Sequence, residues 1–232
     1  MKNSKLLIRG GVLLFSLIVS VQKANSTELT IDHLYRDLDK TTVDEVEIAQ
    51  HFASGFKLSG TVQFAPENQA NGDSGLPFQS ERWYETKLKA AYSIHLDKGW
   101  VLEPGFSFIR KQNAYKYRPF LKVKKSLNDT TNVAIRYRKE ITDKSGDNKK
   151  VDHTDLYFIE DIDKATLAYR YSYYHGNQNL YDHSRHDYEH KIELDYKLTK
   201  MFSPYISFAN KSVGASYRER QTEVEVGLSL KI

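Results

Sequence analysis

Basic residues spaced two positions apart are the part of this sequence with the clearest chemical potential. Arg136 and Arg138 are separated by one residue, and so are Lys87 and Lys89. Residues two apart on a β-strand project from the same face. A guanidinium stays charged and holds a carboxylate through two parallel hydrogen bonds. Rows of this kind would give an anionic solute a series of transient contacts, provided that strands arrange them around one passage.

Strands are what the rest of the sequence predicts. The segment 191–198 alternates strictly between charged and apolar residues, and similar alternation recurs along the chain. We expect strands at 28–36, 45–52, 55–64, 84–96, 100–110, 116–125, 131–142, 152–161, 164–175, 186–198, 202–212 and 220–231. This is an even number of strands, with no helix to cover their apolar faces. Such faces then require another apolar environment, and lipid supplies one.

The connections between these strands fall into two groups. Five are tight, at 53–54, 97–99, 127–129, 161–163 and 199–200, whereas those at 65–83, 143–151 and 176–185 are long and polar. Bacterial outer-membrane barrels have short turns at the periplasmic rim and longer loops outside. The sequence therefore predicts an all-β fold, a 12-stranded antiparallel transmembrane β-barrel of the bacterial outer membrane, with outer-membrane lipid as its surroundings.

The first 26 residues have the form of a secretory signal peptide. Lys2, Lys5 and Arg9 precede an apolar stretch at 12–21, and the run at 24–26 is Ala-Asn-Ser, a small-x-small cleavage site. We expect residues 1–26 to be removed and 27–232 to form the barrel. The segment carries four of the 34 basic residues and no acidic residue, so the mature chain has 30 basic and 30 acidic residues.

The composition excludes several functional classes. A balanced mature charge removes the support for nucleic-acid binding. With no cysteine there is neither a disulfide framework nor a thiolate metal site, and we expect no metal and no cofactor. A mean hydropathy of −0.61 excludes a helical membrane protein, but a barrel with a polar lumen and polar loops has such a value.

In a closed barrel the charged face of each strand must line the lumen. A Lys or Arg facing lipid near the midplane costs roughly 2–4 kcal/mol. The predicted lumen charges are Arg36, Lys57, Lys87, Lys89, Arg118, Lys122, Arg136, Arg138, Arg170 and Lys197, with Glu45, Glu47, Glu193, Asp195, Glu223 and Glu225. Twelve strands enclose a narrow pore, in which opposing charges would create a transverse field. Alternatively, Arg136 and Arg138 pair with carboxylates on neighbouring strands and serve structure alone.

Two segments stand apart from this pattern. The run Glu103-Pro104-Gly105 places a proline inside a strand, and we expect a β-bulge there.

His183, His186 and His190 cluster with Asp182, Ser184 and Asp187 near the start of a strand. These residue types could serve an outer-membrane hydrolase, although loops are rich in them for turn chemistry alone. A metal site would need a helix to align the three histidines, and this segment is typical of a loop that enters a strand.

The chain also resembles a known family. The runs at 102–106 (Leu-Glu-Pro-Gly-Phe), 117–121 (Tyr-Arg-Pro-Phe-Leu), 136–138 (Arg-Tyr-Arg), 186–190 (His-Asp-Tyr-Glu-His), 203–205 (Ser-Pro-Tyr) and 221–222 (Gln-Thr) appear in the order found in the small oligogalacturonate-specific porins, which include sialic-acid porins. The resemblance implies a monomeric twelve-stranded channel for acidic sugars or acidic oligosaccharides, without catalytic residues.

The resemblance also assigns residues, and it marks departures. It implies that Arg36, Arg118, Lys122, Arg136 and Arg138 are lumen cations that contact the solute. Glu45, His51, Glu223 and Glu225 stand where the family usually has arginine, and Arg170, Lys87 and Lys89 are basic residues gained here. The architecture is therefore expected to carry over more closely than the choice of acidic sugar.

Overall fold

The computed structural model describes residues 26–68, 75–76, 78–146 and 148–232. The predicted signal peptide falls almost entirely outside the described residues. The strands are β1 (Ser26–Arg36), β2 (Thr42–His51), β3 (Phe56–Pro66), β4 (Glu81–Tyr92), β5 (Ile94–His95), β6 (Trp100–Lys111), β7 (Tyr115–Ser126), β8 (Thr131–Asp143), β9 (Lys150–Ile162), β10 (Ala165–Gly176), β11 (His186–Tyr196), β12 (Phe202–Ser212) and β13 (Arg220–Lys231). A 3-10 turn, η2 (Asp97–Gly99), precedes β6.

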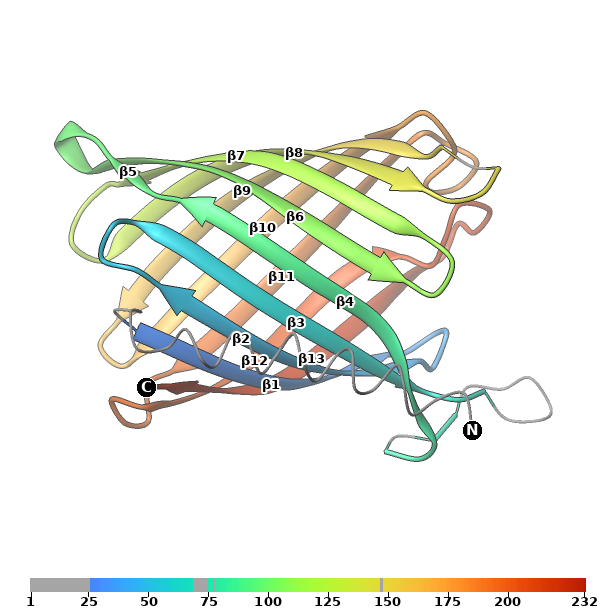
Figure 1. Cartoon of the computed structure of the whole chain (residues 1–232), viewed down its shortest axis with the longest axis horizontal. Helices are drawn as coiled ribbons and strands as arrows, with labels where there is room; N and C mark the ends of the chain where they lie inside the picture. Colours follow the sequence, from blue (N-terminus) through green and yellow to red (C-terminus); the bar gives the residue numbers. More distant parts are fainter. Residues whose placement is uncertain (1–25, 69–74, 77, 147) are drawn as a thin grey trace.

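These strands form a closed antiparallel barrel. Each long strand pairs with its neighbour in sequence, β1 pairs with β13, and β4 pairs with β6. Because β5 continues the line of β4 after a break at Ser93, the barrel has the twelve strands predicted from the sequence. Figure 1 shows the strands tilted around a common axis. Each of the twelve long strands therefore has a partner on both sides, which satisfies the backbone hydrogen bonds of a wall that lies in lipid.

The two faces of the wall differ as the alternation predicted. Outward positions hold exposed apolar side chains, such as Ile135, Tyr137 and Leu121, each 44–48% exposed. The positions between them, such as Arg136 and Lys122, face the interior, where they contact other polar side chains. No helix among the described residues has the length and apolar character needed to cross a membrane.

The predicted sorting of connections is also confirmed. The tight turns gather at one rim, where the ends of the described chain also meet: Thr27 and Ile232 exchange backbone hydrogen bonds of 3.0 and 2.8 Å. The strand ends that the long connections join, which are those of β3 and β4, β8 and β9, and β10 and β11, lie at the other rim. In outer-membrane barrels the short-turn rim faces the periplasm. We call it the inner rim, and we call the long-loop rim the outer rim.

The prediction of a bulge at Pro104 is wrong. Ala91 pairs with Gly105 and Ile94 pairs with Leu102, so each strand has two residues between these pairs and the register does not shift. The lost N–H of proline is accommodated by the short interruption at Ser93. A bulge would instead have turned every later side chain of the strand to the other face. The structure places its register shift elsewhere, in the β3–β4 pairing between residues 63 and 64.

Candidate functional site

A column of cations runs along the lumen face of β7. Lys116, Arg118, Lys122 and Lys124 share this face, and Phe120 occupies the position between the two pairs. With Phe120 included, each of these residues is two positions from the next, so the spacing follows from the strand period. Lys116 lies near the outer rim and Lys124 near the inner rim. The column therefore extends through most of the height of the pore.

Neighbouring strands extend this column into a wall of net positive charge. We call the lumen faces of β4, β6, β7 and β8 the basic wall. Its cations are Lys87, Lys89, Lys111, Lys116, Arg118, Lys122, Lys124, Arg136 and Arg138, and its carboxylates are Glu85, Glu103 and Glu140. Nine cations and three anions give a formal net charge of +6.

The opposite part of the barrel carries the reverse charge. We call the lumen faces of β11, β12, β13, β1 and β2 the acidic wall. Its carboxylates are Glu28, Asp32, Glu45, Glu47, Asp187, Glu189, Glu193, Asp195, Glu223 and Glu225, and its cations are Arg36, Lys191, Lys211 and Lys231. Ten anions and four cations give a formal net charge of −6. The predicted field across the lumen thus arises from two contiguous groups of strands.

Close packing holds the acidic wall together. The Tyr205 hydroxyl lies 3.0 Å from Asp32 Oδ2 and 3.1 Å from Glu225 Oε1. Lys191 Nζ donates to Glu225 Oε2 at 2.6 Å, and Ser207 Oγ donates to the same oxygen at 2.9 Å. Asp32 has no basic side chain within 4.0 Å among the described residues. The contact that holds its carboxyl group is the one with the Tyr205 hydroxyl.

Five of the eight predicted contact residues are paired with carboxylates. The pairs are Arg36 with Glu223 at 2.8 Å, Arg118 with Glu140 at 2.5 Å, Arg136 with Asp155 at 2.7 Å, Arg170 with Glu189, and Lys87 with both Glu45 and Glu47 at 3.8 Å. The pairing that the structural alternative predicts is therefore present for Arg136. These cations hold the wall in a fixed geometry as well as contributing charge.

The Arg136 pair belongs to a buried polar cluster. Asp155 is fully buried, and its carboxylate accepts hydrogen bonds from Arg136 Nε at 2.7 Å and Ser172 Oγ at 2.6 Å. His153 Nε2 lies 2.7 Å from Asp155 Oδ1, the oxygen that also accepts from Ser172. Arg138 contacts the His153 ring. The cluster joins β8, β9 and β10 and fixes the direction in which both arginines point.

The other three predicted residues have no carboxylate partner. No carboxylate of the described chain lies within 4.0 Å of Lys89, Lys122 or Arg138. Lys89 Nζ lies 5.6 Å from the centre of the Phe120 ring, and Lys122 Nζ lies 4.8 Å from the centre of the Tyr157 ring. Arg138 Nε is buried without a hydrogen-bond partner. These are therefore the predicted contact residues whose charge no carboxylate of the described chain neutralises by direct pairing.

Sequence reasoning missed several members of both walls. Lys116 and Lys124 share the spacing of Arg118 and Lys122, so strand period alone could have identified them. Asp155 gave no comparable signal. Its role depends on β9 lying between β8 and β10, which the strand pairing decides.

The proposed hydrolase residues are not brought together. His186 and His190 lie on the outward face of β11, where their Nδ1 atoms lie 2.5 and 2.7 Å from the hydroxyls of Tyr173 and Tyr169. Asp187 faces inward and pairs with Arg220 at 3.3 Å. The described residues hold no group of three or more potential ligands arranged for a metal ion. The barrel wall therefore separates His186 and His190 from Asp187, and Asp182, His183 and Ser184 lie in the connection before β11.

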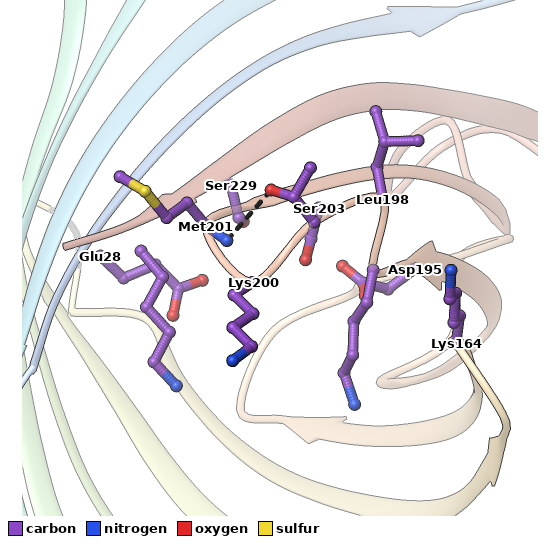
Figure 2. A pocket seen from close by; sticks show the side chains of 11 residues that line it. Glu28, Lys164, Asp195, Leu198, Lys200, Met201, Ser203 and Ser229 are labelled. Atoms are coloured by element: carbon purple, nitrogen blue, oxygen red, sulfur yellow. Dashed lines mark hydrogen bonds between the residues drawn. The ribbon is translucent and has the colours of Figure 1, made fainter.

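Cavities occur near both rims of the pore. A cavity of about 190 Å³ near the outer rim is lined by Glu140, Lys149, Val151, His153, Tyr174, Leu180 and Asp187. A cavity of about 600 Å³ lies at the inner rim, and Figure 2 shows side chains that line it. The predicted lumen residues Asp195 and Lys197 both lie there. The barrel thus has open space near each rim.

Comparison with known proteins gives a consistent match along the chain. The family model described as oligogalacturonate-specific porin protein (KdgM) matches residues 19–231. The oligogalacturonate-specific porin KdgM of Dickeya dadantii is 29% identical over 93% of this chain and 97% of its own length. The N-acetylneuraminic acid outer membrane channel protein NanC of Escherichia coli is 26% identical over 64% of this chain and 68% of its own length.

A solved structure agrees with the fold. The NanC porin structure superposes with a TM-score of 0.74 at 20% identity, covering 88% of this chain and all of that one. The closed twelve-stranded barrel, its charged lumen and the match over residues 19–231 support one conclusion: the chain is an outer-membrane porin that belongs to the KdgM family of oligogalacturonate-specific porins.

Proposed function

We propose that this porin conducts acidic sugars and acidic oligosaccharides by passive diffusion along its basic wall. Lys89, Lys122 and Arg138 act as exchangeable contacts for the carboxylates of the solute. Arg36, Lys87, Arg118, Arg136 and Arg170 supply charge while they hold neighbouring side chains in place. The observation that carries this proposal is that Lys89, Lys122 and Arg138 have no carboxylate within 4.0 Å in the described chain.

The acidic wall has a role in the same proposal. An anion in the lumen is repelled by the net −6 of that wall and attracted by the +6 of the basic wall. Because charges interact more strongly in a narrow, partly desolvated passage than in bulk water, this difference concentrates the solute on one side. Passage also requires contacts that are weak enough to release the solute. Single ammonium and guanidinium contacts meet this requirement better than an enclosed pocket.

The names of the relatives support this class of solute. One is named for oligogalacturonate and another for N-acetylneuraminic acid, and both of these compounds carry carboxylates. The function needs no covalent step, metal or cofactor. A monomer is enough, because one chain closes the barrel.

Bilayer conductance with a sugar-acid titration tests the proposal. We expect galacturonate to reduce or interrupt the chloride current in a saturable manner, and uncharged galactose to have no such effect at equal concentration. The variant Lys89→Gln with Lys122→Gln should weaken this effect. The matched control is Lys40→Gln with Lys144→Gln, which removes the same charge from exposed loop positions. If the native pore is cation-selective and its current does not change when uronates are added, the proposed class of solute is refuted. The conclusion that the barrel is a pore would not be affected.

A further inference from the structure

The cavity at the inner rim is built by lumen-facing residues and turns of the acidic-wall side. Its strand residues are Glu28 on β1, Asp195 on β11, Ser203 on β12, and Ser229 and Lys231 on β13. The connection after β11 supplies residues 197–201, and Lys164 comes from the turn between β9 and β10. In Figure 2, Lys200 extends into the space between Glu28 and Asp195, and Lys164 lies beyond Asp195.

The floor and edges of this cavity are held by main-chain hydrogen bonds. Lys231 N donates to Met201 O at 2.8 Å, which joins the end of β13 to the turn. Lys197 N donates to Lys164 O at 2.8 Å, which joins the two neighbouring turns. Met201 N donates to Thr199 Oγ1 at 3.2 Å within the turn. The backbone that carries the lysines is therefore fixed by bonds that do not involve their side chains.

Four lysines line the cavity, and their ammonium groups are unpaired. Lys164, Lys197, Lys200 and Lys231 have no carboxylate within 4.0 Å among the residues that the structure describes. The cavity also contains the two carboxylates of Glu28 and Asp195. Its lining therefore has a formal net charge of +2. The hydroxyls of Thr199, Ser203 and Ser229 add neutral hydrogen-bonding groups.

This positive cavity is not a continuation of the basic wall. It lies at the inner end of β11, β13 and β1, whose lumen faces form the acidic wall above it. In strand order around the barrel, these strands are opposite β7 and β8. The sign of the charge on this side therefore changes from negative to positive at the inner rim. A solute that follows the basic wall meets a second group of cations across the lumen when it reaches the periplasmic end.

We propose that this inner-rim cavity is a separate binding site for one or two carboxylated sugar units, at which the solute stays before it enters the periplasm. The proposal rests on the proposed function and adds a second site to it. A volume of about 600 Å³ falls within the range of small-molecule sites. The lysines match the carboxylates of an acidic sugar, and the three hydroxyls match its ring hydroxyls.

The site gives transport a direction-dependent property that the basic wall alone does not give. An anionic sugar arriving from the periplasm meets the four lysines first, whereas one arriving from outside meets the β7 column first. Charges at the mouth of a channel chiefly change the rate at which charged solutes arrive. Removing the inner lysines should therefore alter binding from the periplasmic side more than from the outer side.

Side-specific block of single channels tests this inference. Lys144→Cys, in an outer connection of a chain without cysteine, provides one thiol, and a membrane-impermeant maleimide then identifies the outer side of each inserted channel. In this background, the cavity pair is a variant that carries both Lys164→Gln and Lys231→Gln. The control pair is a variant that carries both Lys98→Gln and Lys125→Gln. The control removes the same charge near the inner turn at residues 97–99, outside the cavity. The probe is trigalacturonate, added to one side at a time. Folding of each variant is verified by heat-modifiable migration on gels.

We expect the cavity pair to lower the rate of trigalacturonate block from the inner side by roughly fivefold and to leave the rate from the outer side within about twofold. The control pair should leave both rates within about twofold. An unchanged inner-side rate, or an equal fall in the control pair, would overturn the inner site and leave the proposed function standing. If trigalacturonate interrupts the native channel from neither side, both proposals fail.

Discussion

Replacing both Arg136 and Arg138 by alanine is the most direct test of the basic wall. Arg136 is bound to the buried Asp155, whereas Arg138 has no carboxylate partner and contacts His153. The double variant lowers the formal charge of the basic wall from +6 to +4. It also exposes Asp155, which then keeps only its contacts with His153 and Ser172. We expect anion preference to fall and the barrel to remain folded, since no backbone pairing is removed.

The magnitude follows from Coulomb's law. A monovalent ion that passes about 7 Å from one of these charges changes its free energy by roughly 0.6 kcal/mol if the lumen behaves as water. This corresponds to a factor of about three in partition, and a lower effective dielectric in the narrow lumen would increase it. Loss of these positive charges lowers the partition of anions into the lumen and raises that of cations. The ratio of chloride to potassium permeability should therefore fall at least threefold at about 0.1 M salt, where the Debye length is about 10 Å.

Reversal potentials across a salt gradient measure this ratio. The informative control is Arg136→Ala with Asp155→Asn, which removes one positive and one negative charge and leaves the net charge of the lumen unchanged. We expect the control to keep a permeability ratio close to that of the native channel. Both variants should migrate as folded barrels on unheated gels.

Two outcomes would refute this reasoning. If Arg136→Ala with Arg138→Ala keeps the native reversal potential, the basic wall does not set ion preference. If the charge-neutral control changes the reversal potential as much as the double arginine variant does, the shape of the lumen determines selectivity and the charges do not.

Three further predictions follow from individual contacts. Asp155→Asn should lower the free energy of unfolding by about 3–5 kcal/mol, because it leaves buried donors without their carboxylate. Denaturant titration of the refolded barrel measures this free energy, and a loss below about 1 kcal/mol would contradict the prediction. Gly105→Ala should lower the same free energy of unfolding by roughly 1–3 kcal/mol, because the new methyl group would overlap the Phe120 ring. A free energy of unfolding equal to that of the native barrel would show that the ring can move aside freely. His183→Ala with His190→Ala should leave conductance unchanged, and the native chain should release no product from phospholipid or ester substrates; turnover that these substitutions abolish would restore the hydrolase hypothesis.

Sequence reasoning worked well where a local pattern decides the outcome. The alternation at 131–142 predicted a strand with Arg136 and Arg138 inward and Tyr137 outward, and β8 has that arrangement. The prediction of a β-bulge at Pro104 was wrong, because the neighbouring strand is interrupted at Ser93 and the register does not shift. Whether a proline causes a bulge depends on the partner strand, which the local sequence does not describe.

The sequence by itself determined that this chain is a twelve-stranded barrel with a charged interior, because strand period and exclusion of charge from lipid act on every strand separately. It also determined which side chains face the lumen. Only the tertiary structure decided which of those charges neutralise one another. Arg136 meets Asp155 because the register of β8 and β9 places the two residues opposite each other. Arg36 meets Glu223 because closure of the barrel pairs β1 with β13. Lys89 has no carboxylate within 4.0 Å among the described residues. The separation into a basic and an acidic wall likewise depends on the circular order of the strands, which places β7 across the lumen from β13.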